Sequence, residues 1–241
     1  MAYLGSANSE DALTWNVFRS LQKAQRLDIV ADWLRVEICK PRAMLIWCLA
    51  PELTNDNPKL QFQLGDLLRN TDGMIPGQIG EPDVVIQGAE GIVVIECKLG
   101  ELYKPLAHLW EGRSLQQVKK RLSRYQQDVP NLMKDDETEA DVMPMYQLVR
   151  MAYYAIRLRQ ICKRRPTLVS LGNKSNWSLQ IRKCRKSPVD LWDIFLSSLG
   201  SIELHCTSTN WQSLLPLLEG RELDYLHQCL SQPPCLRCQS E

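Results

Sequence analysis

Apolar residues return along this chain with two different spacings, one typical of helices and one of strands. Between Glu10 and Ala24 they recur every three or four residues, and Asn8 or Ser9 precedes them as a cap, which predicts a helix. Residues 27–39, 60–69, 114–127, 145–163, 191–199 and 211–230 are also predicted to be helical. Helices therefore account for most of the expected regular structure.

Short runs of β-branched residues predict the strands. The strongest are Asp83–Ile86 and Ile92–Lys98, joined by a five-residue connection that contains two glycines, as in a β-hairpin. Thr167–Leu171 and Ile202–Cys206 predict two further strands, whereas Ala43–Leu49 fits a strand or a helix. Helices that flank and alternate with such a small sheet predict the α/β fold class.

The length and composition fit one globular domain. A chain of 241 residues can bury a sizeable core, and its 44% hydrophobic and 24% charged residues are ordinary for such a domain. No run of about eighteen apolar residues is present, which argues against a membrane span. The N-terminus lacks the pattern of a secretory signal, so a cytoplasmic location and reduced cysteines are expected. Cys229, Cys235 and Cys238 fit a reduced tail, which is favoured, or a metal site.

Positive charge is unevenly distributed, although the net charge is only +1. Three basic runs follow the strand pair: Lys119, Lys120, Arg121 and Arg124; Arg157, Arg159, Lys163, Arg164 and Arg165; and Arg182, Lys183, Arg185 and Lys186. A single run of this kind is often no more than a solvated surface. Three runs in one half of the chain predict a surface that binds phosphate groups, as nucleic-acid-binding proteins have.

The end of the second β-branched run carries the candidate chemistry. Side chains alternate along a strand, so Glu96 and Lys98 are expected on one face and Cys97 on the other. Asp83 begins the partner strand and is expected close to Glu96. Two neighbouring carboxylates repel unless a cation lies between them, and their hard oxygens suit Mg²⁺ or Mn²⁺. The alternative interpretation is a structural Glu–Lys ion pair beside an unrelated turn aspartate.

The chain contains Pro82-Asp83, a spacer of twelve residues, and then Glu96-Cys97-Lys98. This pattern, on a glycine-turned hairpin, resembles the motif of the PD-(D/E)xK nuclease superfamily. The resemblance implies a restriction endonuclease-like core, in which a small mixed β-sheet is flanked by α-helices. It also implies that Asp83, Glu96 and Lys98 are catalytic, that both carboxylates hold the metal, and that Lys98 assists the attacking water. The carbonyl group of Cys97 would supply a further metal ligand.

Two helices extend the resemblance. Many members carry a glutamate on the first core helix that completes the metal site, and Glu10 lies on the inward stripe of the predicted first helix. The alternative role of Glu10 is a helix-start carboxylate favoured by the helix dipole. In the RecB-like branch, a helix after the catalytic strands carries a glutamine, followed four residues later by tyrosine, where this chain has Met151. The predicted nucleic-acid contacts on this helix and the preceding basic helix are Gln147, Arg150, Arg157, Lys119 and Lys120.

These features predict one domain over residues 1–241, with a helical insertion at about 27–80 and a strand–helix extension at about 175–241. The expected function is a Mg²⁺- or Mn²⁺-dependent nuclease that hydrolyses phosphodiester bonds, with DNA and endonuclease action favoured. The alternative is a catalytically silent nucleic-acid-binding or scaffold subunit of a larger defence or repair complex. No membrane partner is expected, and both a homodimer and a complex with another protein stay open.

Overall fold

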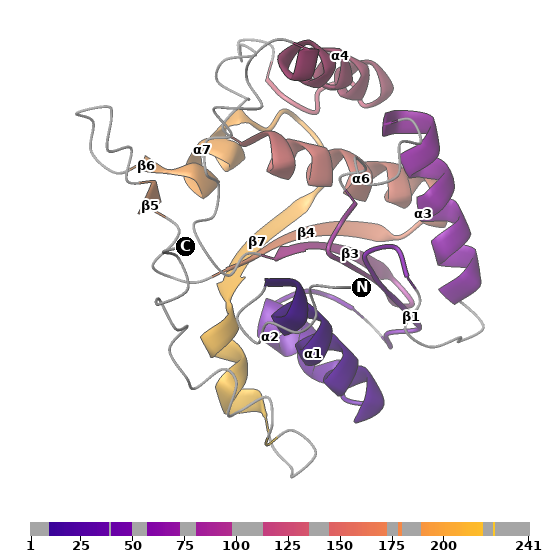
Figure 1. Ribbon diagram of the computed structural model, residues 1–241, viewed down its shortest axis with the longest axis vertical. Helices are drawn as coiled ribbons and strands as arrows, with labels where there is room; N and C mark the ends of the chain where they lie inside the picture. Colours follow the sequence, from indigo (N-terminus) through magenta and orange to yellow (C-terminus); the bar gives the residue numbers. More distant parts are fainter. Residues whose placement is uncertain are drawn as a thin grey trace.

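A computed structural model of the chain describes residues 10–38, 40–49, 57–72, 81–97, 113–134, 145–172, 178–179, 189–218 and 224. Within these ranges, a mixed β-sheet is covered by helices on both faces (Figure 1). The fold class is therefore α/β, as the sequence predicts.

The central sheet contains five strands in the order β1-β2-β3-β4-β7. Strands β1 (Ala43–Ile46), β2 (Val84–Gln87) and β3 (Gly91–Cys97) pair antiparallel, and β4 (Arg165–Gly172) and β7 (His205–Asn210) continue the sheet parallel to β3. Parallel neighbours need a long crossover connection, and the crossover between β3 and β4 contains helices. The described sheet thus has an antiparallel half and a parallel half that meet at β3.

Four helices cover one face of the sheet, above it in Figure 1: α3 (Asn57–Asp72), α4 (Arg113–Asp128), α6 (Tyr146–Cys162) and α7 (Leu191–Ser198). Helix α6 packs directly on β3 and β4, while α3 packs on β1 and on α6. Helix α4 packs against α3 and α6, so it forms an outer layer farther from the strands. We call this side of the sheet the α6 face.

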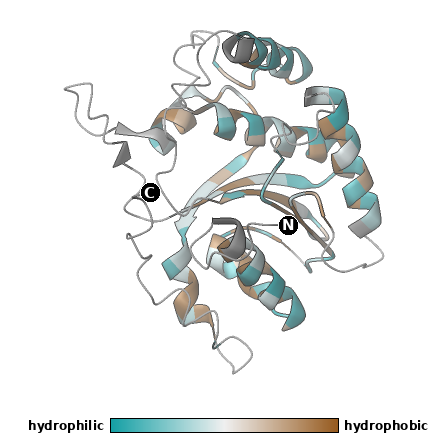
Figure 2. Ribbon diagram, viewed as in Figure 1, coloured by the Kyte–Doolittle hydropathy of each residue, from teal (hydrophilic) through white to brown (hydrophobic). Residues whose placement is uncertain are grey.

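The opposite face is covered by α1 (Glu10–Lys23), α2 (Asp28–Leu34) and the 3₁₀ helix η4 (Trp211–Leu217), below the sheet in Figure 1. Val17, Phe18 and Leu21 project from α1 into a cluster that includes Val93 and Ile95 of β3. Figure 2 shows hydrophobic and hydrophilic residues interleaved along the covering helices, as expected when one side of each helix meets the core. We call this side the α1 face.

Strand β3 is buried along its whole length, which explains its β-branched composition. A strand covered by helices on both faces needs apolar side chains at nearly every position rather than at every second one. Gly91 begins β3 because the carbonyl oxygen of Glu37 lies where a Cβ atom would project. The connection between β2 and β3 is a short turn in which Gly88 N–H donates to the Gly91 carbonyl at 2.8 Å.

Several element bounds differ from those predicted. The stretch expected to be a helical insertion contains α2, the sheet strand β1, and α3, so part of it belongs to the central sheet. Helix α2 ends at Leu34 because Arg35 adopts a left-handed conformation, with φ of 54°. The strand predicted at 202–206 lies at His205–Asn210, and the chain then forms a 3₁₀ helix that contains Pro216 instead of the start of an α-helix.

Between β4 and α7, the chain also forms a short antiparallel sheet of two strands, β5 (Ser178–Leu179) and β6 (Val189–Asp190). Four described cysteines, at positions 48, 97, 162 and 206, are free thiols. No helix in the described ranges combines the length and the apolar composition that a membrane span requires.

Candidate active site

The β2–β3 hairpin brings the two predicted carboxylates together. Val84 pairs with Ile95, so extending this register by one residue places Asp83 directly opposite Glu96. The backbone N–H of Cys97 donates a hydrogen bond of 2.6 Å to Oδ2 of Asp83. On the other side, the N–H of Trp47 donates to the backbone carbonyl of Asp83 at 2.9 Å. The position of Asp83 is therefore set by strands on both sides of it.

The alternation of side chains along β3 follows the prediction. Ile92 and Val94 lie in the hydrophobic cluster of the α6 face, whereas Val93, Ile95 and Cys97 lie in that of the α1 face. Glu96 belongs by this alternation to the α6 face. Its side chain is only 3% exposed, which is unusual for a carboxylate and requires a compensating partner.

Arg150 of helix α6 lies near Glu96. The turn after α6 reverses the chain directly into β4, so the first turns of α6 lie over the carboxyl ends of β3 and β4. Arg150 is itself buried at 9% exposure, with its guanidinium 5.5 Å from the centre of the Tyr146 ring. Burial acts to lower the pKa of Arg150, but three surrounding tyrosines and the Glu96 carboxylate raise it, and the net direction is upward. Arg150 is therefore a permanent cation within electrostatic reach of Glu96.

Ser170 of β4 is a neighbour of the carboxylates that was not predicted. It pairs with Glu96 across the parallel β3–β4 ladder and, one strand farther, with Ser208 of β7. Its side chain is completely buried, and its Oγ has no hydrogen-bond partner among the described residues. Asp83, Glu96 and Ser170 thus form a polar row across three adjacent strands. The only sequence signal was a lone hydroxyl in an apolar strand.

Two of the predicted site residues are not fully described by the structure: Glu10 lacks a described side chain, and Lys98 lies outside the described residues. Glu10 is the first residue of α1, and the described part of the structure does not include its side chain. The rings of Trp15 and Trp47 stack with centroids 6.1 Å apart, and the backbone N–H of Trp47 donates a hydrogen bond to the Asp83 carbonyl. The first half of α1 therefore lies toward the carboxylates. Lys98 lies outside the described residues, one position beyond the end of β3.

The predicted nucleic-acid contacts separate into different environments. Gln147 lies on the same turn of α6 as Arg150 and is partly exposed. Lys119 and Lys120 are exposed on α4, in the outer layer rather than beside the sheet. The third basic run, at residues 182–186, lies outside the described residues, as does the cysteine-rich tail.

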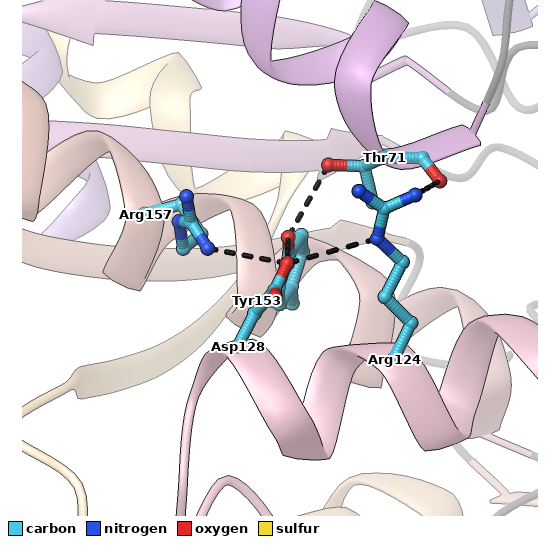
Figure 3. A network of polar contacts seen from close by, with 5 residues as sticks. All are labelled: Thr71, Arg124, Asp128, Tyr153 and Arg157. Carbon is cyan, nitrogen blue, oxygen red and sulfur yellow. Dashed lines mark hydrogen bonds and ion pairs between the residues drawn. The ribbon is translucent and has the colours of Figure 1, made fainter.

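Arg157 takes part in a polar network that joins three helices (Figure 3). Its guanidinium forms an ion pair of 3.2 Å with Asp128 of α4, and Asp128 also accepts a 2.7 Å hydrogen bond from the Tyr153 hydroxyl. The same hydroxyl lies 3.2 Å from Oγ1 of Thr71 on α3. Burial is the main cause that raises the pKa of Tyr153 above its ordinary value. The structure therefore gives Arg157 a packing role, whatever its part in binding.

The donor atoms at the carboxylate pair fit a hard divalent cation. Asp83 and Glu96 supply carboxylate oxygens, and the carbonyl of Cys97 follows them on the same strand end. A carboxylate has about four lone-pair positions, so the hydrogen bond from Cys97 does not exhaust Asp83. No group of three or more His, Cys, Asp or Glu side chains suited to a metal occurs in the described residues. Water and substrate oxygens would have to complete such a site, as is usual for Mg²⁺.

Comparison of the chain with protein-family models, with characterised proteins and with solved structures finds no match.

Proposed function

We propose that this protein is a Mg²⁺- or Mn²⁺-dependent nuclease with a PD-(D/E)xK type of site. The observation that carries the proposal is the placement of Asp83 and Glu96 opposite each other at the open end of a hairpin, with Glu96 buried. The order of elements supports it, because a first helix, a carboxylate-bearing hairpin and a later helix over the site are what the resemblance leads one to expect. Here these elements are α1, β2–β3 and α6.

Asp83, Glu96 and the Cys97 carbonyl are the groups that would hold the cation. When bound, such an ion supplies a Lewis acid that activates water and offsets the charge that develops on a phosphate. The chain supplies the rigid frame: Cys97 N–H fixes the Asp83 carboxylate, and the sheet fixes Glu96. A frame of this kind keeps the donors in place before substrate arrives, so little reorganisation is needed.

The remaining residues would handle the substrate's charge. Arg150 is a buried cation on the same face as Glu96, and its Nε has no hydrogen-bond partner among the described residues. A guanidinium in such a position can bind a phosphate oxygen in the plane of its N–H groups. Lys98 would assist the attacking water. Gln147, within one helical turn of Arg150 on α6, would contact the nucleic-acid backbone. Lys119 and Lys120 would interact with the backbone farther away.

The test is cleavage by the purified full chain. Supercoiled, linear and circular single-stranded DNA, and an RNA of the same sequence, are incubated with Mg²⁺ or Mn²⁺. Asp83→Asn and Glu96→Gln remove one charge each with almost no change of shape, and Lys98→Ala removes the lysine. We expect each variant to lose on the order of a hundredfold or more of the rate, because removing one such electrostatic contact commonly has that effect.

Asp32→Asn is the matched control, because Asp32 is an exposed carboxylate on α2. It should cleave as the wild type does. Cleavage of circular substrates identifies endonuclease action, and their survival while linear DNA disappears identifies exonuclease action. Equal cleavage by wild type, Asp83→Asn and Glu96→Gln would show that a different site, or a contaminant, is responsible.

One observation favours a second candidate, a nucleic-acid-binding or scaffold subunit without cleavage. Arg150 interacts electrostatically with Glu96, so a protein cation can balance this carboxylate without a metal. A titration with Mn²⁺ separates the two candidates. A nuclease site binds Mn²⁺ through Asp83 and Glu96, and both variants weaken this binding. A scaffold in which Arg150 neutralises Glu96 binds Mn²⁺ no better than the variants do.

A further inference from the structure

A basic groove lies at the end of the sheet opposite to the carboxylates. Its volume is about 1240 Å³, and its walls come from the second half of α6, the β2–β3 turn, the start of β4 and the segment before β7. The β2–β3 turn and the Asp83–Glu96 pair are at opposite ends of the same hairpin. Glu96 is five positions after Gly91 on β3, so the groove begins about 17 Å from the carboxylates.

The walls of the groove carry an excess of positive charge. Arg159, Lys163, Arg164 and Arg165 line it, against the two carboxylates Glu90 and Glu203. Arg159 is paired with Glu203, and Arg165 is paired with Glu37 at 3.2 Å. Within the described part of the chain, Lys163 and Arg164 form no ion pair. A single cation near the C-terminus of α6 would satisfy the helix dipole. The groove carries four basic residues, which is more than the dipole accounts for.

Arg164 provides the second observation. Its Nε atom is inaccessible to solvent and has no hydrogen-bond partner among the described residues. A buried polar N–H without a partner is unfavourable, and such groups are rare in folded proteins. The neighbouring Lys163 is held in the left-handed region, with φ of 55°, where its N–H closes the end of α6 on the Arg159 carbonyl. Both cations therefore have defined backbone positions.

We propose that this groove binds the phosphate backbone of a nucleic-acid strand at a distance from the carboxylate pair. The proposal rests on the proposed function, because it assigns the groove to the same substrate. Phosphate oxygens would accept hydrogen bonds from the Arg164 guanidinium and attract Lys163, and a volume of about 1240 Å³ accommodates several nucleotides of a strand. In a duplex, where each strand advances about 3.4 Å along the axis per nucleotide, a distance of about 17 Å corresponds to roughly five nucleotides.

The experiment measures binding without cleavage, by fluorescence anisotropy of a labelled 30-nucleotide strand and of its duplex, in EDTA, from 50 to 200 mM salt. The groove variants are Lys163→Gln with Arg164→Gln, and Lys163→Glu alone, which changes an exposed residue and so keeps the fold. The control is Lys23→Ala with Arg26→Ala, two basic residues near the end of α1 on the opposite side.

We expect the double groove variant to bind on the order of tenfold more weakly at the higher salt, with the slope of log K against log[salt] reduced by about 2. Lys163→Glu should weaken binding in the same direction, and the control should not. Wild-type affinity and slope in both groove variants would overturn the proposal, as would a wild type that binds no nucleic acid.

The binding result does not depend on catalysis, so the two proposals fail separately. A groove effect on binding in a protein that never cleaves DNA or RNA leaves the groove assignment standing and removes the nuclease. Cleavage that Asp83→Asn abolishes, together with groove variants that bind and cleave like wild type, leaves the nuclease and removes the groove.

Discussion

The two faces of the central sheet are both buried, yet different kinds of side chain fill them. The α1 face is filled with aliphatic residues and with a group of aromatic rings. The ring centroid of Trp33 lies 5.8 Å from that of Phe18 and 5.8 Å from that of Trp211. The indole N–H of Trp33 donates to Oγ of Ser213 at 3.1 Å, so even this polar atom has a partner. The α6 face also has an apolar cluster, which includes buried tyrosines. This face additionally buries an arginine, Arg150, and a carboxylate, Glu96.

The unpaired buried atoms follow the same division. In the described residues, four buried side-chain atoms lack a hydrogen-bond partner, on Arg150, Arg157, Arg164 and Ser170. Two belong to α6, one to the turn after it and one to the strand beneath it. Buried polar groups are normally satisfied, because leaving one without a partner costs stability. Because several such atoms gather on the α6 face, we expect a ligand, water or metal to bind on this side of the sheet. The α1 face then serves as structural support.

The comparison is tested most strongly by a charge on the α1 face. Val93→Asp places a carboxylate among the apolar side chains of the cluster that contains Phe18. We expect the free energy of unfolding to fall by about 3–5 kcal/mol, because an unpaired charge is buried. Denaturant unfolding measures this loss. Val93→Ala, which only removes about two methyl groups, should cost about 2 kcal/mol, and equal losses in the two variants would contradict the description of this face.

The next largest effect is expected on the α6 face, where metal should stabilise the protein. At a Mn²⁺ concentration of a hundred times the dissociation constant, the wild type should gain about 2.7 kcal/mol of stability. Glu96→Gln and Asp83→Asn should lose this gain, because each removes a carboxylate that would hold the metal. Thermal unfolding with and without Mn²⁺ gives the difference. The same metal-dependent gain in Glu96→Gln would exclude Glu96 as a ligand.

A smaller effect is expected from the network in Figure 3. Tyr153→Phe removes the hydroxyl that bonds to Asp128 and approaches Thr71, and we expect a loss of about 1 kcal/mol. Asp128→Asn should cost a similar amount, because it weakens the pairing with Arg157. A double variant with both changes should lose less than the sum, since the two residues share one network. An additive result from urea unfolding would show that they act independently.

The smallest expected effect has the opposite sign. Ser170→Ala removes a completely buried hydroxyl without a partner among the described residues, so stability should rise by about 1 kcal/mol. If Ser170 serves the site, cleavage or Mn²⁺ affinity should fall at the same time. Thr207→Ala, on the neighbouring strand β7, is a control for loss of a strand hydroxyl. Lower stability of Ser170→Ala would mean that this hydroxyl has a partner, such as bound water.

Much of the fold could be predicted because local patterns dominate there. The first helix, the hairpin and the long helix before β4 were placed within a few residues, since each has a strong periodic or β-branched pattern. The shift of β7 and the 3₁₀ conformation of η4 were not predicted, because strand register depends on the partner strand and Pro216 prevents a regular α-helix.

The candidate site divides in the same way. The sequence by itself determined that Asp83 and Glu96 lie at one end of a hairpin and that Glu96 and Cys97 face opposite sides, because a strand has a period of two. Only the tertiary structure decided that Arg150 lies near Glu96, that Ser170 pairs with it, and that Arg157 belongs to another network. These positions follow from how α6 packs on β3 and β4. Glu96 is more than fifty positions from both Arg150 and Ser170 in sequence, and no local pattern encodes their proximity.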